Sequence, residues 1–175
     1  MIPKFGNNSL VLERFKVSDS EDILNALIFS YQEIAPWLNW LTPEYNLKSA
    51  EDFVYLQIDS WNKNIEYTFT IRNHSGHLLG VIGLHCFDKQ NDVAMIGYWM
   101  NSKFTGNGYC TQALKLLVEN SLAPLDLIRI EVMVALENKA SQKVAENAGA
   151  TFEAVLKNRV RLNGIAIDAK MYAFT

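Results

Sequence analysis

The chain has 175 residues, of which 49% are hydrophobic and 20% are charged; this balance is typical of a globular protein, and we expect a single domain over residues 1–175. A net charge of −3 argues against direct nucleic-acid binding through a broad basic face. The two cysteines have no metal-ligand spacing, and neither a signal peptide nor a membrane-length apolar run is evident, so we expect a cytoplasmic protein that binds no metal and no membrane.

The first part of the chain is predicted to hold one strand and two helices. Residues 9–15 alternate loosely between apolar and polar side chains, which is typical of a strand. A capping-box pattern begins a predicted helix over residues 18–30. After an aromatic-rich segment at residues 36–40, a second capping pattern predicts a helix over residues 49–62.

The rest of the chain alternates between strands and helices. Three short runs rich in β-branched and aromatic residues predict antiparallel strands at residues 66–72, 77–87 and 93–100. Asn163-Gly164 is a strong hairpin signal near the C-terminus. Two more helices are predicted at residues 109–122 and 138–148. Three more strands are predicted at residues 127–135, 152–160 and 165–174. This order predicts a mixed α/β (α+β) domain of about seven strands and about four helices.

The loop at residues 103–108 carries the first chemical signal. It joins a predicted strand to a predicted helix, and free backbone amides at a helix N-terminus attract anions. Gly106 and Gly108 have no side chains that would keep a phosphate away from the backbone. A dinucleotide fingerprint would need a third glycine where Thr111 stands, and no Gly-Lys-Ser/Thr follows as in a Walker loop.

Several motifs in order resemble the GNAT superfamily of N-acetyltransferases, and its RimJ/RimL branch in particular. The pyrophosphate loop of that family, Gln/Arg-x-x-Gly-x-Gly/Ala, is similar to Lys103-Phe-Thr-Gly106-Asn-Gly108. The strand before it resembles Ile96-Gly-Tyr-Trp-Met100, and the Glu-Asn-x-x-Ser segment of the branch resembles Glu137-Asn-Lys-Ala-Ser141. The resemblance covers nearly the whole chain.

The resemblance implies a GNAT fold, with a mostly antiparallel sheet splayed between the fourth and fifth predicted strands. It also implies acetyl transfer from acetyl-CoA to a primary amine by direct attack in a ternary complex. The expected acceptor is the N-terminal α-amine of a protein, of the ribosomal-protein type. Two alternatives stay open: a small amine such as a polyamine, amino acid or antibiotic, and a CoA-binding module without activity. A homodimer is compatible with the family.

The resemblance also assigns residues to the cofactor. Asn138 would contact CoA and Ser141 would give a proton to the departing thiolate, although both also suit the plain start of a helix. A backbone N–H near the end of the fourth predicted strand would polarise the thioester carbonyl. The predicted cofactor-binding residues are Trp99, Met100, Lys103, Phe104, Thr105, Gly106, Asn107, Gly108, Tyr109, Thr111, Asn138 and Ser141.

A general base must remove a proton from the ammonium form of the acceptor, and the sequence offers two candidates. Glu131 lies on a predicted strand beside the cofactor slot, where a charged side chain can equally be a solvated residue. His85 lies on a neighbouring strand and has a suitable pKa, but it can equally be a structural histidine. Met95 stands where many RimJ/RimL-like sequences have a glutamate, so a base is missing at that position.

Overall fold

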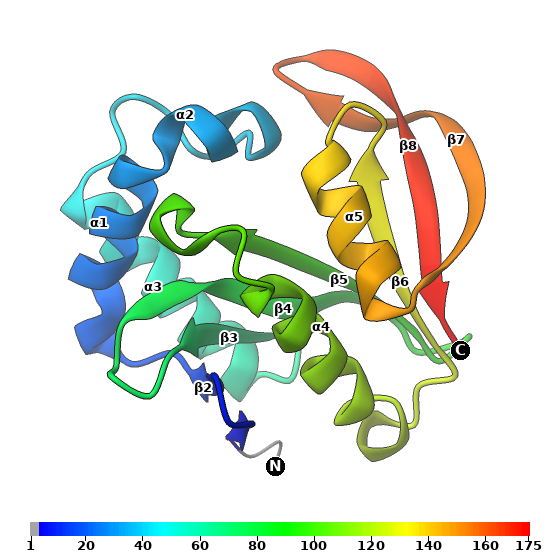
Figure 1. The fold of residues 1–175 in the computed structure, drawn as a ribbon, viewed down its shortest axis with the longest axis horizontal. Coiled ribbons are helices and arrows are strands. Elements are labelled where there is room, and N and C mark those ends of the chain that lie inside the picture. Colours follow the sequence, from blue (N-terminus) through cyan, green and yellow to red (C-terminus); the bar gives the residue numbers. More distant parts are fainter. Residues whose placement is uncertain (1–3) are drawn as a thin grey trace.

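The computed structural model describes residues 4–175 and shows a sheet of eight strands (Figure 1). The strands lie side by side in the order β1-β2-β3-β4-β5-β6-β8-β7. Every neighbouring pair is antiparallel except β5 and β6. In chain order the strands are β1 (Phe5–Gly6), β2 (Val11–Arg14), β3 (Tyr67–Arg72), β4 (Leu78–Asp88), β5 (Val93–Met100), β6 (Arg129–Ala135), β7 (Thr151–Leu162) and β8 (Ile165–Phe174).

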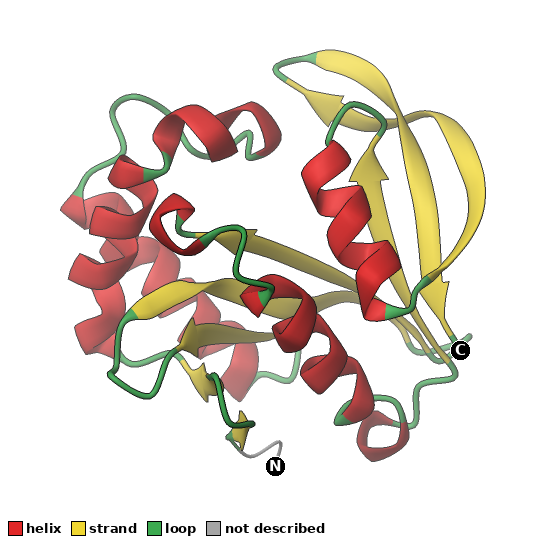
Figure 2. Ribbon diagram, viewed as in Figure 1, coloured by secondary structure: helices red, strands yellow, loops and turns green. Residues whose placement is uncertain are grey.

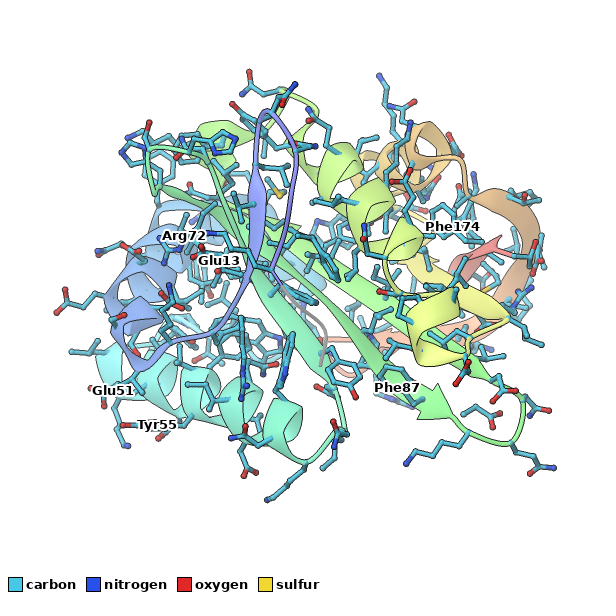
Figure 3. All side chains as sticks on the ribbon, turned by 90° about the horizontal axis from the view of Figure 1, so that it is seen from below. Glu13, Glu51, Tyr55, Arg72, Phe87 and Phe174 are labelled. Carbon is cyan, nitrogen blue, oxygen red and sulfur yellow. The ribbon has the colours of Figure 1, made fainter. Side chains whose placement is uncertain are left out.

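The helices cover the two faces of the sheet (Figure 2). Helices α4 and α5 pack on one face and contact each other, while α1 and α3 form a second contacting pair. Figure 3, turned by 90°, shows α3 and α4 on opposite sides of the strands. Among residues 4–175, none of these helices is long and apolar enough to span a bilayer. The helices are α1 (Ser20–Phe29), α2 (Tyr31–Ile34), α3 (Leu47–Asn62), α4 (Tyr109–Glu119) and α5 (Lys139–Ala148).

The alternation along the strands sorts side chains between these two layers. On β6, Ile130, Val132 and Val134 are buried in a core cluster that also holds the inner residues of α4 and α5. On the opposite face, Val81 of β4 and Trp99 of β5 belong to a second cluster with residues of α1 and α3. Burial of both faces therefore fixes the register of the central strands.

The sheet opens between β5 and β6. These two strands are parallel, and their pairing covers only Val93–Met95 against Arg129–Glu131. From Ile96 to Met100, β5 keeps its partner on the β4 side but has none on the β6 side. The predicted splay between the fourth and fifth strands is therefore confirmed. It leaves a slot whose wall includes unpaired backbone groups.

Arg72 of β3 fixes the start of α1 against the sheet (Figure 3). Its guanidinium donates to the carboxylates of Asp19 and Asp22, each at 2.8 Å. Asp19 is buried and also accepts the N–H of Lys16 at 2.7 Å, whereas the predicted capping box of Ser18 and Glu21 is not formed, since α1 has no side-chain cap. These contacts replace the predicted side-chain cap at the beginning of the helix.

Most predicted elements are present, with three differences. The short strand β1 and the one-turn helix α2 were not predicted, because each has too few residues to show a period. Helix α3 begins earlier than expected, since Asn46 rather than Ser49 caps it and accepts the N–H of Ser49 at 3.2 Å. The hairpin at Asn163-Gly164 is confirmed, and both residues have positive φ, as a tight turn requires.

Candidate active site

The loop before α4 presents a continuous run of free backbone donors. Within residues 4–175, the N–H groups from Gly106 to Thr111 donate no hydrogen bond, and the first bonded amide is that of Gln112, to the carbonyl of Gly108. Gly106 and Gly108 have φ of +79° and +72°, a conformation that costs other residues strain. The loop is therefore shaped as an anion site at the start of a helix.

The side chain of Asn107 supports this shape. Its Nδ2 donates to the carbonyls of Phe104 and Thr105 at 3.2 and 3.1 Å, which holds those carbonyls away from the free amides. The N–H groups of Phe104 and Thr105 are already bonded to Asn101 and Ser102. The free donors consequently begin at Gly106, so Phe104 and Thr105 of the predicted cofactor residues offer no free amide.

The side chains around the loop differ in exposure. Lys103 is exposed, and its Nζ lies 5.8 Å from the centre of the Phe104 ring. Tyr109 and Thr111 are half-buried in the first turn of α4. Cys110, next to them, is buried, and this burial raises the pKa of its thiol to about 12. Cys110 is therefore a packing residue rather than a reactive thiol.

The end of β5 forms one wall of the slot. Trp99 is buried on the face covered by α1 and α3, and its indole N–H has no partner among the described residues. Met100 is half-buried on the other face, near the core that α4 completes. The backbone between them runs along the unpaired edge of β5, so both predicted cofactor residues lie at the slot.

A pair of hydroxyl groups lies on the α5 side of the slot. Ser141 Oγ donates to Tyr98 Oη at 3.1 Å, and Tyr98 Oη donates to the carbonyl of Ser141 at 3.0 Å. Asn138 caps α5, because its Oδ1 accepts the N–H of Ser141 at 3.0 Å. The cap leaves the Ser141 hydroxyl free to bond Tyr98 instead of its own backbone.

Tyr98 is a site residue to which the sequence analysis gave no role beyond its place in the Ile96–Met100 motif. Burial raises the pKa of its phenol, so the hydroxyl keeps its proton near neutral pH. The alternation of β5 could have indicated this role, since Tyr98 shares a face with Ala94 and Ile96, which pack under α4.

His85 lies on the opposite face of the sheet. It pairs with Met95 across β4 and β5, and its Nε2 lies 3.2 Å from where a Cβ on Gly97 would stand. The missing side chain at Gly97 therefore makes room for the imidazole. Burial lowers the pKa of His85, and the charge of Glu66 opposes this only in part. His85 is consequently neutral at pH 7, as a base must be.

Glu131 is in the same row but is already paired. Glu131 lies on β6 and pairs with Met95 of β5, and its carboxylate accepts a hydrogen bond from Arg129 Nε at 2.8 Å. Arg129 also binds the carboxylate of Glu153 on β7. The Glu131 carboxylate is therefore already occupied by a guanidinium. Of the two candidate bases, His85 is the one with a free nitrogen facing Gly97.

A cavity of about 350 Å³ lies beyond the slot, where the α2 region meets the tip of the β7–β8 hairpin. Asn39 joins the two, because its Nδ2 donates to the carbonyl of Arg161 at 2.6 Å and its Oδ1 accepts from the N–H of Asn163 at 3.0 Å. The cavity is lined by uncharged side chains, among them Tyr31, Gln32 and Asn39.

Comparison with known proteins agrees with this geometry. Residues 9–151 match the family model described as an acetyltransferase (GNAT) domain. The ribosomal-protein-serine acetyltransferase of Escherichia coli is 32% identical over 55% of this chain and 54% of its own length. YdaF of Bacillus subtilis, named as a candidate ribosomal N-acetyltransferase, is 27% identical over 95% of this chain and 91% of its own.

Solved structures show the same fold. RimL, an L7/L12 α-N-protein acetyltransferase solved with coenzyme A, has a TM-score of 0.90 and 22% identity, covering 98% of this chain and 97% of its own. The microcin C7 self-immunity acetyltransferase MccE, solved with acetyl-CoA and AMP, has a TM-score of 0.89 and 24% identity. The match covers 97% of this chain and 93% of MccE's own.

Proposed function

The chain belongs to the GNAT acetyltransferase family, and we propose that it transfers an acetyl group from acetyl-CoA to the N-terminal α-amine of a protein, of the ribosomal-protein type. The observation that carries this proposal is the free amide run from Gly106 to Thr111 beside the open slot between β5 and β6. Anion binding and a strand-like slot are together what a phosphorylated cofactor with an extended amide arm requires.

In this proposal the chain holds acetyl-CoA with its backbone. The amides from Gly106 to Thr111 bind the pyrophosphate, and the unpaired edge of β5 up to Met100 bonds the pantetheine amides as an added strand would. Acetyl-CoA supplies a thioester whose carbonyl carbon accepts the amine. An N–H on this edge of β5 stabilises the charge on the carbonyl oxygen, an effect worth about 3 kcal/mol.

The base and the acid lie on opposite faces of the sheet. His85 shares the α1/α3 face with Met95 and Trp99, whereas Tyr98 and Ser141 meet on the α5 face. His85 Nε2 accepts a proton from the acceptor ammonium on the first face. On the second face the Ser141 hydroxyl turns from Tyr98 to the thiolate: its O–H bond breaks as the S–H bond forms, the serine oxygen takes the proton of the Tyr98 hydroxyl beside it, and water returns a proton to Tyr98. The slot connects the two faces.

The role of His85 predicts how kcat depends on pH. A base must be neutral, and the pKa of His85 lies below its ordinary 6.5 because the ring is buried. We expect kcat to fall with decreasing pH as one group is protonated, with its half-maximal value below pH 6.5. Glu66 is the charged neighbour that opposes this shift, while Arg129 and Glu131 neutralise each other beyond Met95. A half-maximal kcat at or above pH 6.5 would contradict this role.

The hydroxyl pair predicts a second kinetic effect. We expect Ser141→Ala and Tyr98→Phe each to lower kcat about 10-fold, a modest loss because a thiol with a pKa of about 8.5 leaves with little help. Acetyl-CoA affinity should stay within about twofold of wild type, since the N-cap of α5 is untouched. Steady-state kinetics and calorimetry measure both. A wild-type kcat in both variants would limit Ser141 to the helix start.

The acceptor class rests on the named relatives and on amine chemistry. RimL and the Escherichia coli relative are named for ribosomal-protein substrates. An α-amine has a pKa of about 8, so a useful neutral fraction exists near neutral pH. In this proposal the cavity lined by Asn39 and Tyr31 receives the side chain of the acceptor's first residue.

An acceptor comparison tests the proposal. Release of CoA thiol is measured with a peptide that begins with serine, with the same peptide blocked at its N-terminus, and with a polyamine. We expect the free peptide to have the highest kcat/KM and the blocked peptide to be inert. A polyamine that reacts better than the peptide would replace the protein acceptor with a small amine. No release with any acceptor would favour a binding module without activity.

A further inference from the structure

Cys86 makes an unusual contact with the proposed base. Its Sγ lies 3.2 Å from Nδ1 of His85, the residue directly before it. Neighbouring side chains on a strand normally point to opposite faces, so this contact needs a break in the pleat. The register between β4 and β5 shifts between His85 and Asp88, and Cys86 has a φ of +51°. The bulge turns Cys86 toward the imidazole.

We propose that Cys86 is a positioning residue that keeps the proton of His85 on Nδ1 and so leaves the lone pair of Nε2 free for the acceptor amine. The inference rests on the proposed function, because it assigns a second residue to the same base. The two ring nitrogens are distinct, and the hydrogen bond at one of them decides which carries the proton.

The surroundings of the ring support this assignment. Within residues 4–175, the sulfur of Cys86 is the one hydrogen-bond partner of His85. Nε2 lies over Gly97, which has no side chain to meet it. When Nδ1–H donates to the sulfur, the half-buried ring has its only donor satisfied and Nε2 is ready to accept. The opposite tautomer would place its N–H over Gly97 without a partner among the described residues, which is less favourable than the bonded Nδ1–H form.

The proton transfer balances in this arrangement. One N–H bond of the acceptor ammonium breaks and an Nε2–H bond forms, while Nδ1 keeps its proton throughout. The ring then carries one positive charge, and the amine gains the electron pair with which it attacks the thioester carbonyl. Cys86 neither gains nor loses a proton.

Nuclear magnetic resonance tests the tautomer without reference to activity. The protein is labelled with ¹⁵N-histidine, and its three imidazoles are recorded at pH 7.5 by their long-range ¹⁵N–¹H couplings. Loss of one signal set in the His85→Gln variant identifies His85. We expect His85 with its proton on Nδ1, and a shift toward the Nε2–H form in Cys86→Ala. An Nε2–H tautomer in the wild-type protein would overturn the inference.

Kinetics separates this inference from the proposed function. Cys86→Ser keeps an acceptor beside Nδ1 and is the matched control for Cys86→Ala. We expect Cys86→Ala to lower kcat about 10-fold with acetyl-CoA affinity unchanged, and Cys86→Ser to stay within about twofold of wild type. Cys86 is exposed, so both variants should fold, which their unfolding midpoints check. If His85→Gln is inactive but Cys86→Ala equals wild type, the inference fails and the base stands. If His85→Gln is fully active, the proposed base fails.

Discussion

Replacing Gly106 with valine is expected to weaken acetyl-CoA binding at least about 30-fold. Gly106 has a φ of +79°, which a β-branched residue adopts only with strain, so the loop should shift. A shift misaligns the free amides that begin at this residue. Losing about 2 kcal/mol of hydrogen bonding to a charged group corresponds to about 30-fold in Kd. Calorimetric titration with acetyl-CoA measures the change.

Gly76→Val is the matched control for this experiment. Gly76 has a φ of +83° in the turn between β3 and β4, and an added Cβ meets nothing within 4 Å there, as at Gly106. The two variants therefore share the same backbone strain, but only one lies in the amide run. We expect Gly76→Val to lose stability and keep its affinity. Equal affinities for wild type and Gly106→Val would remove this loop from the cofactor site.

His85→Gln is expected to lower kcat about 100-fold or more, which is the typical loss when a general base is removed. Glutamine fills a similar volume over Gly97 but accepts no proton near neutral pH. The loop from Gly106 to Thr111 is on a different part of the chain, so the Kd for acetyl-CoA should change less than about twofold. The decisive readout is a fall in kcat at constant cofactor affinity.

His74→Gln serves as the control for this variant. His74 is exposed in the turn after β3, where its Nε2 lies 2.9 Å from the carbonyl of Asn7. This turn is not part of β5 or β6, the strands between which the slot opens. We expect His74→Gln to keep wild-type kcat. If His85→Gln retained a wild-type kcat and pH profile, the deprotonation would have to be assigned to Glu131 or to a water chain.

The fold could be predicted largely from local patterns. The strand at Val93–Met100 appeared at its predicted bounds, because alternation and flanking turns both indicated it. Helix α5 was equally clear, with Asn138 as its cap and Gly149 at φ +95° as its end. Helix α2 and strand β1 were missed, since short elements are held by tertiary contacts rather than by their own period.

The parts of the site that consist of one continuous segment could be predicted from the sequence, but the contacts between distant residues could not. The loop around Gly106 and Gly108 is one such segment, and its glycines were visible in the sequence. The bond between Tyr98 and Ser141 joins residues 43 positions apart, and no local pattern indicates it. Glu131 is engaged by Arg129, two residues away on the same face of β6, but the further pairing of Arg129 with Glu153 joins residues 24 positions apart and has no local signal. The contact of Cys86 with His85 needed the bulge, which strand alternation alone would exclude.

The most direct test of the account is a calorimetric titration of the purified wild-type protein with acetyl-CoA, run beside NADH and ATP. All three ligands carry a pyrophosphate, but only acetyl-CoA also has an amide arm that fits the open edge of β5. We expect binding of acetyl-CoA with a Kd on the order of micromolar, and much weaker binding of the other two. Folded protein that does not bind acetyl-CoA, or binds NADH equally well, would contradict the assignment of the loop and the slot.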